Sequence, residues 1–429
     1  MSSGGPWAGR TLHFVGIGGA GMQGWARVAT QLGARVSGSD SADSPALADL
    51  SALGATVHIG HDAANVPEGA EVVYSSAVPA ENSERAVARE QGWPERPRAE
   101  LLRELTSLKR TIAIAGAHGK TTTTAMCAHV LREVGMDPGY LIGGTLAATG
   151  LNAEWGTGDW LVVEADESDR SMLALDVDVA VVTNVELDHH ATYGSLEEVR
   201  DVFRSFLAGA PEAVLWDRPD VLDLRADGAA VVTFDEPEPR LALRVPGAHN
   251  QRNAAAAVAA AVLAGAEEAA ARAAVATFAG AGRRFEDVGR TASGARVVCD
   301  YAHHPTEVAA TIAAAREVAE GRVVALFQPH LFSRTAHLAA EFGAALAAAD
   351  LVALLDVYPA RERAEDWPGT SGQTLVETAR AAGAPRVLWL PTAADVERDL
   401  VGELRPDDLL LCLGAGDIDA LARRLGYPA

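Results

Sequence analysis

The clearest chemical signal in the chain is the segment TIAIAGAHGKTTTT, residues 111–124. An apolar strand that enters a glycine-bounded loop and then a helix exposes backbone N–H groups, which together with the helix dipole can hold phosphate oxygens. Lys120 can reach the β- and γ-phosphates of a triphosphate, and the Thr121 hydroxyl is placed to ligate magnesium. The spacing is shortened, because Ile114 stands where the distant glycine of the usual motif is expected. We therefore predict a Mg-ATP site built from Gly116, Ala117, His118, Gly119, Lys120, Thr121 and Thr122.

Two acidic segments follow the next apolar runs of the same region. WLVVEADESD (160–169) and VVTNVELDHH (181–190) each place carboxylates after a strand, and loops at the carboxyl ends of parallel strands are the usual ligand sites. Taken alone, such a cluster is more often a solvated loop than a metal site. Beside a phosphate loop, however, a magnesium ion needs oxygen ligands, and Glu164 is the natural candidate. A histidine ligand from the second segment would be less usual and would indicate a second metal position.

A second glycine-rich loop lies near the N-terminus, in HFVGIGGAGM (13–22). Gly16, Gly18 and Gly21 have the GxGxxG spacing after a strand, and Asp40 ends the next strand, as in a dinucleotide fingerprint. An NAD-dependent dehydrogenase is therefore one interpretation. Any nucleoside diphosphate can use the same loop, however, and the chain has a separate phosphate loop for another nucleotide. Two loops for two phosphorylated ligands favour a transfer or a ligation.

Short β-branched runs alternate with alanine-rich helical stretches in three blocks, a pattern typical of parallel sheets flanked by helices. The strands that lead into the motifs are predicted at 11–17, 34–40, 111–116, 160–166 and 179–185. The predicted fold class is α/β with three domains, each a mostly parallel sheet with flanking helices. The N-terminal domain (1–107) is expected to be Rossmann-like, the central domain (108–290) to resemble a P-loop ATPase, and the C-terminal domain (291–429) to be Rossmann-like.

Composition excludes several classes of protein. The 429 residues carry a formal charge of −22 and no basic tract, which would repel a phosphate backbone, so we expect no nucleic-acid partner. No stretch reaches the roughly 20 apolar residues of a membrane span, so we expect no membrane partner. The three widely spaced cysteines are typical of a reducing compartment and predict a cytoplasmic location. Lys109 and Lys120 are the only lysines, so a lysine inside a phosphate loop is easy to notice.

Ten segments in the same order resemble the Mur ligases, a family of peptidoglycan precursor synthesis. They are HFVGIGGAGM, GAHGKTTT, EADESDRS, NVELDH, VPGAHNQRNA, GRRFE, DYAHHPTE, FQPHLFSRT, DVYPARE and GAGDI. Within that family, EADESDRS and GIGGAGM look like the branch that joins L-alanine to UDP-N-acetylmuramate. A close alternative is the recycling branch, which attaches an intact tripeptide to the same sugar nucleotide.

The resemblance implies an ATP-dependent, amide-forming ligase with one role for each block. The N-terminal block would bind UDP-N-acetylmuramate, the central block ATP, and the C-terminal block would close over both with L-alanine. The implied cofactors are ATP and Mg²⁺, with Mn²⁺ able to substitute. The implied partners are the small molecules UDP-N-acetylmuramate, L-alanine and ATP, and both a monomer and a homodimer are compatible with the sequence.

The resemblance also assigns residues to each ligand. The UDP-sugar is expected at Gly18, Gly19, Ala20, Gly21, Met22, Asp40, Ser75 and Ser76. Besides the loop, the nucleotide is expected to contact Asn253, Arg284 and Asp300, and the metal ligands are Thr121, Glu164 and His189. Substrate carboxylates are expected at His303, His330 and Arg334, and the catalytic set is Lys120, His189, His303 and Arg334.

Several of these residues also have simpler explanations. His303 and His304 could cap or pack the helix that begins near Pro305, and Arg284 could form an interdomain salt bridge. Ala117 replaces the loop threonine of the family, which removes a hydroxyl but no backbone donor. Two further departures from the family pattern, Ala191 and Cys299, stand where aspartates are common, which weakens any role for those positions.

The implied reaction begins when the lactyl carboxylate attacks the γ-phosphate of ATP, which gives an acyl phosphate and ADP. The L-alanine amine then attacks the activated carbonyl, and phosphate leaves as the amide forms. Besides the dehydrogenase, a nucleotide-controlled binding module stays open as an alternative. Such a module would bind both nucleotides without releasing phosphate.

Overall fold

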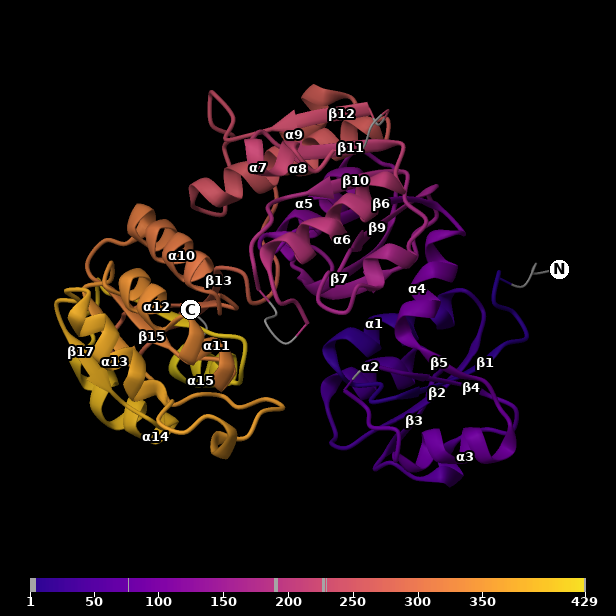
Figure 1. Cartoon of the computed structure of the whole chain (residues 1–429), viewed down its shortest axis with the longest axis horizontal. Coiled ribbons are helices and arrows are strands. Elements are labelled where there is room, and N and C mark those ends of the chain that lie inside the picture. Colours follow the sequence, from indigo (N-terminus) through magenta and orange to yellow (C-terminus); the bar gives the residue numbers. More distant parts are fainter. Residues whose placement is uncertain (1–4, 76, 189–191, 226–227, 229, 428–429) are drawn as a thin grey trace. The chain divides into compact units, whose positions relative to one another are not determined.

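Strands in the described part of the chain form three sheets, each flanked by helices (Figure 1). The computed structural model describes residues 5–75, 77–188, 192–225, 228 and 230–427. The chain divides into two compact units, of which the first holds two sheets and the second holds one. The first unit is Met1–Asp235 with Asn253–Ala276, and the second is Glu236–Arg252 with Thr277–Ala429. The predicted α/β class with three mostly parallel sheets is confirmed.

The N-terminal sheet is entirely parallel, with the strand order β3-β2-β1-β4-β5. In such a sheet the order reverses beside β1, and ligands bind at the carboxyl ends of the strands next to that switch point. The strands are β1 (Thr11–Val15), β2 (Arg35–Asp40), β3 (Thr56–Ile59), β4 (Glu71–Tyr74) and β5 (Glu95–Pro97). The helices are α1 (Ala20–Gln31), α2 (Pro45–Ala52), α3 (Ser83–Gln91) and α4 (Arg98–Thr106).

The second sheet has the order β12-β11-β10-β6-β9-β7-β8, and only the edge strand β8 is antiparallel to its neighbour. Its strands are β6 (Arg110–Ala115), β7 (Gly139–Leu146), β8 (Leu151–Glu154), β9 (Trp160–Glu164), β10 (Val179–Val182), β11 (Glu212–Trp216) and β12 (Ala230–Phe234). Its helices are α5 (Lys120–Glu133), α6 (Leu196–Ala208), α7 (Pro219–Leu222), α8 (Ala248–Leu263) and α9 (Glu268–Val275), and the boundary between the two units falls within α8.

The third sheet has the order β13-β14-β18-β15-β16-β17 and is parallel except for the edge strand β13. Its strands are β13 (Glu286–Arg290), β14 (Arg296–Asp300), β15 (Val323–Phe327), β16 (Leu351–Leu354), β17 (Val387–Trp389) and β18 (Leu409–Leu413). Its helices are α10 (Pro305–Val318), α11 (Phe332–His337), α12 (Ala339–Leu346), α13 (Gly372–Ala381), α14 (Ala393–Asp395) and α15 (Ile418–Leu425).

The central strands are short apolar runs because parallel sheets are covered on both faces. In the first unit, one apolar core includes Trp25 of α1, Val163 of β9 and Phe203 of α6, so the first two sheets share a core. The third sheet has a core on each face, with Phe327 in one and its neighbour Leu326 in the other. Burial of both faces explains why these strands show no alternation of polar and apolar residues.

The five strands predicted beside the motifs are confirmed as β1, β2, β6, β9 and β10. The β7–β8 hairpin was not predicted, because GYLIGGTL and LNAE lack a continuous apolar run. The predicted central domain ends at residue 290, whereas β13 pairs with β14 and so belongs to the third sheet. The other domain boundaries stay predictions.

A buried polar network ties α3 to the N-terminal sheet. Glu84 is fully buried and accepts hydrogen bonds from the Ser39 hydroxyl at 2.6 Å and the Asn65 amide at 3.1 Å. Its carboxylate also lies 3.5 Å from Nε2 of His13 on β1. Burial acts to raise the pKa of Glu84, but the bonds from His13, Ser39 and Asn65 outweigh burial and lower it to about 2. Glu84 therefore stays ionised and links α3 to two strands.

Replacing Glu84 by alanine should destabilise the fold, because the donors of Ser39 and Asn65 would lose a buried acceptor. We expect the free energy of unfolding, measured in urea, to fall by about 2–4 kcal/mol. Glu90, which is exposed on the same helix, provides the control, and Glu90→Ala should change the free energy by less than about 0.5 kcal/mol. Equal stabilities of the two variants would show that the network is not a major contributor.

Candidate active site

The phosphate loop connects β6 to α5 through two glycines whose backbone conformations other residues rarely adopt. Gly116 has φ +140° and Gly119 has φ +82°. A Cβ at Gly116 would lie 2.0 Å from Thr183 Oγ1, and a Cβ at Gly119 would lie 2.7 Å from Asn253 Oδ1. Both positions therefore require glycine. The predicted strand-loop-helix is confirmed, and Asn253, predicted to contact the nucleotide, lies beside the loop.

Two residues that follow β10 hold this loop in place. Thr183 Oγ1 and Asn184 Nδ2 both donate to the His118 carbonyl, at 2.6 Å and 2.9 Å. Asn184 Oδ1 accepts from the His118 N–H at 2.9 Å, and His118 Nε2 lies 3.1 Å from Glu186 Oε2. These contacts order the loop before a ligand binds, which lowers the entropic cost of binding.

Lys120, the first residue of α5, is surrounded by oxygen atoms. Its Nζ donates to the Gly116 carbonyl at 2.5 Å and to both carboxylate oxygens of Glu167 at 3.0 Å. Burial acts to lower the pKa of Lys120, but the negative charges of Glu167 and Asp166 outweigh burial and raise that pKa above its ordinary value. Lys120 is therefore positively charged at neutral pH, as a ligand for terminal phosphates must be.

Hard oxygen donors lie next to this lysine. The Thr121 hydroxyl donates to Glu164 Oε2 at 3.3 Å, and Glu164 Oε1 accepts from the Gly143 N–H at 2.5 Å. The carboxylate is thus held at the end of β9, beside the first turn of α5. A hydroxyl and a carboxylate are ligands that Mg²⁺ prefers, so this pair fits a divalent cation. His189, the other predicted ligand, lies outside the described residues, and its role stays a prediction.

The N-terminal glycine loop has the same strand-to-helix form. Gly16 has φ +75°, and the Gly18 N–H donates to Asp40 Oδ2 at 2.9 Å, so Asp40 closes the loop from the end of β2. A Cβ at Gly18 would lie 3.1 Å from that oxygen. Gly19 is the N-cap of α1. The other residues predicted here are Ala20, Gly21 and Met22 in the first turn of α1, Ser75 after β4, and Ser76 outside the described residues.

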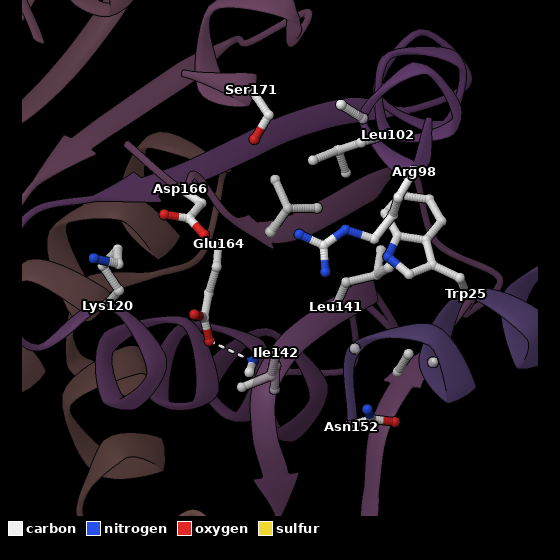
Figure 2. A pocket seen from close by; sticks show the side chains of 16 residues that line it. Trp25, Arg98, Leu102, Lys120, Leu141, Ile142, Asn152, Glu164, Asp166 and Ser171 are labelled. Carbon is white, nitrogen blue, oxygen red and sulfur yellow. Dashed lines mark hydrogen bonds between the residues drawn. The ribbon is translucent and has the colours of Figure 1, made fainter. Parts of the chain in front are cut away.

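A pocket of about 190 Å³ in the first unit is lined by Gly21, the last glycine of the N-terminal motif, and by Lys120 of the phosphate motif; Figure 2 shows Lys120 and Trp25 among its walls. Gly21 and Trp25 of α1 belong to its wall, and so do Lys120, Glu164 and Asp166. The first turns of α1 and α5, which follow the two glycine loops, therefore contribute to one cavity. This arrangement matches the expectation that two phosphorylated ligands meet, although the individual site residues stay predictions.

Sequence reasoning did not find several lining residues that come from α1, α4, β7, β8 and the segment after β9. They are Trp25, Arg98, Leu102, Leu141, Ile142, Gly143, Asn152 and Ser171. Apart from Ser171, which ends the segment EADESDRS, none of them belongs to a recognisable motif, so their positions depend on tertiary packing. The sequence did contain a signal for Arg98. A cation at the first position of a helix is unfavourable because it opposes the helix dipole, so its presence there indicates a role other than helix stabilisation.

In the second unit, basic and aromatic side chains gather at the ends of β14 and β15. The rings of His303 and His330 have centroids 6.2 Å apart, and Arg334 Nη1 lies 3.5 Å from His330 Nδ1. The His330 ring also stacks on Tyr358, with centroids 5.8 Å apart. The structure thus brings together the three residues predicted to bind substrate carboxylates. Their contact with a substrate stays a prediction.

The alternative roles proposed for the two histidines before α10 are resolved in part. His304 is the N-cap of α10 and forms a capping box with Glu307, so the capping explanation holds for this residue. His303 lies outside the helix, with Nδ1 3.0 Å from the Tyr301 carbonyl oxygen and 3.2 Å from Glu307 Oε2. These contacts orient the His303 ring within the cluster.

Asp300 ends β14 and is buried. Its two carboxylate oxygens accept hydrogen bonds from the N–H groups of Phe285 and Ala302, each at 2.8 Å. Burial raises the pKa of Asp300 to about 6, against the opposing influence of Arg284 and the two hydrogen bonds. The guanidinium of Arg284 lies 5.0 Å from the centroid of the Tyr301 ring. Of the three residues predicted to contact the nucleotide besides the loop, Arg284 and Asp300 thus belong to the second unit, and Asn253 belongs to the first.

Comparison with protein families accounts for most of the chain. Residues 11–110 match the Mur ligase family, catalytic domain; residues 114–238 match the Mur ligase middle domain; and residues 283–416 match the Mur ligase, glutamate ligase domain. The chain belongs to the Mur ligase family. The expected ATP-dependent, amide-forming ligase is thereby confirmed as the enzyme class.

Individual Mur ligases match over nearly the full length. The UDP-N-acetylmuramate–L-alanine ligase of Streptomyces avermitilis is 43% identical, covering 99% of this chain and 98% of that protein. The enzyme of the same name from Thermobifida fusca is 43% identical, covering 96% and 95%. Among solved structures, the UDP-N-acetylmuramate–alanine ligase of Thermotoga maritima has a TM-score of 0.81 at 29% identity, covering 97% of this chain and 98% of that one.

A murein peptide ligase of Psychrobacter arcticus shares the fold, with a TM-score of 0.71 at 22% identity, covering 97% of this chain and 98% of that one. Membership of the Mur ligase family also implies that the enzyme uses ATP and small-molecule substrates. Within the described residues, no helix is long and apolar enough to cross a bilayer.

The raised pKa of Asp300 predicts a pH-dependent stability. Between about pH 4 and pH 6 the folded chain holds a proton that the unfolded chain has lost, so the free energy of unfolding should fall as the pH rises through this window. For a pKa raised from 3.8 to about 6, the decrease is on the order of 3 kcal/mol. Urea unfolding of the wild type and of Asp300→Asn at pH 4.5 and pH 7 measures this decrease in the free energy of unfolding. The two proteins should differ in their pH dependence, and parallel profiles would contradict the assignment.

Proposed function

We propose that this chain uses ATP and Mg²⁺ to join L-alanine to the lactyl carboxylate of UDP-N-acetylmuramate, in peptidoglycan precursor synthesis. The observation that carries the proposal is the pocket lined by both Gly21 of the N-terminal glycine motif and Lys120 of the phosphate motif. A dehydrogenase would need the first loop alone. The names of the full-length relatives, all UDP-N-acetylmuramate–L-alanine ligases at 42–44% identity, support the choice of substrates.

Each loop receives one nucleotide in this proposal. The block 1–107 holds the UDP group, with the diphosphate at the N-terminus of α1 and Asp40 fixing the loop. The block from residue 108 holds ATP, with its terminal phosphates at Lys120 and at the N-terminus of α5, where helix dipole and amides favour anions. The sugar and its lactyl group then lie in the pocket between α1 and the phosphate loop.

Thr121 and Glu164 are the proposed magnesium ligands. Their oxygens lie 3.3 Å apart beside the phosphate loop, and both are hard donors. When bound there, the cation neutralises charge on the phosphate oxygens. Mn²⁺ has the same preference for oxygen ligands and should also support the reaction. Three buried free thiols, Cys127, Cys299 and Cys412, support the proposal of a reducing, cytoplasmic location.

The chemistry follows from charge and position. The lactyl carboxylate attacks the γ-phosphorus of ATP, the bond to the β-phosphate oxygen breaks, and ADP leaves while Lys120 stabilises the transferring oxygens. The amine of L-alanine then attacks the acyl phosphate carbon, and inorganic phosphate leaves as the amide forms. Walls from α1, α4 and the β7–β8 hairpin limit the access of water to the activated acyl group.

We propose that the cluster of His303, His330 and Arg334 binds substrate carboxylate groups. Arg334 is buried, so its charge acts in a medium of low dielectric, and its guanidinium can bind a carboxylate through two hydrogen bonds. The stacking of His330 on Tyr358 fixes the ring that neighbours this guanidinium. Arg283 has a structural role instead, because its Nη2 donates to the Gly416 carbonyl at 2.8 Å.

The recycling peptide ligase is the second candidate, because solved structures of murein peptide ligases share the fold. The curated relatives favour L-alanine, however, since those at 42–44% identity carry that name over 93% or more of their length. Both candidates use the same sugar nucleotide. They differ only in the size of the amine substrate, so one assay separates them.

Phosphate release from ATP should require every component. We expect turnover with UDP-N-acetylmuramate, Mg²⁺ and L-alanine together, and no turnover when any one of them is omitted. L-serine, glycine and the intact tripeptide are the competing amine substrates, and a small apolar pocket should favour L-alanine over glycine by only about 10- to 200-fold. Turnover with the tripeptide but not with L-alanine would reverse the assignment, and binding of both nucleotides without phosphate release would indicate a binding module.

Lys120→Ala should lower turnover by at least about 10²- to 10³-fold, because the transferring phosphate loses its buried cation. The affinity for UDP-N-acetylmuramate should change little, since its proposed diphosphate site lies at α1. The other lysine supplies the control: Lys109 donates to the Trp155 carbonyl at 2.7 Å, away from the pocket, so Lys109→Ala should stay active. Normal turnover of a folded Lys120→Ala enzyme would refute the role of this residue.

A further inference from the structure

Arg98 is a cation in the pocket for which the described part of the chain offers no hydrogen bond or ion pair. It is the first residue of α4, it is half-buried, and it lines the pocket together with Gly21, Lys120 and Glu164. Figure 2 shows its guanidinium directed into the pocket. Within the described residues, its side chain makes no hydrogen bond and no ion pair. A half-buried guanidinium without an anion contributes little to the stability of the fold, but it is well suited to bind an anionic ligand.

Other arginines of the same domain show the contrast. Arg96, two residues earlier, lies 2.8 Å from Glu71 and 2.7 Å from Glu104, and Arg10 binds the same two carboxylates. The chain carries 58 acidic residues, so carboxylate partners are abundant. The position of Arg98 at a helix N-terminus is also electrostatically unfavourable, because the helix dipole is positive there. The fold thus keeps an unpaired cation in the pocket at a cost in stability.

The contact with α1 locates the anion that would offset this cost. A Cβ at Gly21 would lie 2.8 Å from Arg98 Nη1, so the guanidinium lies against the first turn of α1. Gly21 is the third glycine of the GxGxxG motif, which usually allows close packing of helix and strand. Here the space left by its missing side chain is taken by an arginine. The guanidinium therefore adjoins the amides of a helix N-terminus, the arrangement that binds phosphate.

We propose that Arg98 binds the diphosphate of the sugar nucleotide and completes the anion site at the N-terminus of α1. This inference rests on the function proposed above. The lactyl carboxylate is the other anion of that substrate, but it must reach the ATP γ-phosphate beside Lys120. That side of the pocket carries Glu164 and Asp166, whereas Arg98 adjoins Gly21. The planar fork of the guanidinium suits two phosphate oxygens at once.

Equilibrium binding to two sugar nucleotides tests the assignment. UDP-N-acetylmuramate and UDP-N-acetylglucosamine share the diphosphate, but the second lacks the lactyl carboxylate. Calorimetric titration should show that Arg98→Ala weakens the binding of both by about 10- to 100-fold, the effect of losing charged hydrogen bonds. Arg98→Lys, which keeps the charge but not the fork, should weaken both by a smaller factor.

Arg103 provides the matched control, because it is an exposed arginine on the same helix and does not line the pocket. Arg103→Ala removes the same charge and should change either affinity by less than about 2-fold. The affinity for ATP should be the same in all of these proteins. The midpoint of thermal unfolding should not fall in Arg98→Ala, since within the described residues the side chain has no hydrogen bond or ion pair to lose and its charge opposes the helix dipole.

Three results would overturn the proposal. A loss confined to UDP-N-acetylmuramate would place Arg98 at the lactyl carboxylate, an equal loss of ATP affinity would place it at the other nucleotide, and unchanged affinities would leave it without a ligand. Failure of the proposed function looks different, because the wild-type protein itself would then bind neither sugar nucleotide and release no phosphate. If Arg98→Ala fails to fold, the comparison of Arg98→Lys with the wild type decides among the same results.

Discussion

The arrangement of the first unit depends on keeping the ammonium group of Lys120 charged inside the protein. An uncompensated charge in a site of low dielectric would cost several kcal/mol or would lose its proton. Glu167 and the Gly116 carbonyl remove that cost, and Glu167 is anchored in turn by the Tyr193 hydroxyl, which donates to its backbone carbonyl. The oxygens of a triphosphate can replace these partners. The lysine is therefore ready for phosphate before any nucleotide is bound.

Local donors, rather than overall charge, must attract the substrates. The chain has a formal charge of −22 and the proposed ligands are anions, so long-range electrostatics oppose binding. Two helix N-termini, Lys120 and Arg98 act at short range inside the pocket, where low dielectric strengthens them. Glu164 and Asp166 add negative charge beside the phosphate loop. Because a divalent cation would neutralise these carboxylates, we expect cation and nucleotide to bind with positive cooperativity.

Parallel topology explains why so many chemical residues meet. All strands of a parallel sheet end at the same edge, so residues such as Glu164 at the end of β9, Thr183 after β10 and His330 after β15 collect at the carboxyl edges of their sheets. The exceptions have a use as well. The antiparallel strand β8 extends the second sheet by a hairpin, and its Asn152 lines the pocket. Adjacent residues can also have different roles: His304 caps α10, whereas His303 beside it belongs to the histidine cluster.

The sequence alone determined the fold class and the two glycine loops, and it singled out Lys120, Glu164 and Asp40 as candidate site residues. Strand-to-glycine-to-helix transitions are local, so they leave a signature in a few consecutive residues. It could not reveal Trp25 or Asn152 as pocket residues, nor Glu167 as the partner of Lys120. These roles come from contacts between segments that are far apart in the sequence, such as α1 and β8, and no local pattern encodes which segments meet. Only the packing of α1 against the β7–β8 hairpin, and of α4 against Ser171–Ala174, decided that both motifs contribute to one cavity, since burial of the common apolar core fixes that geometry.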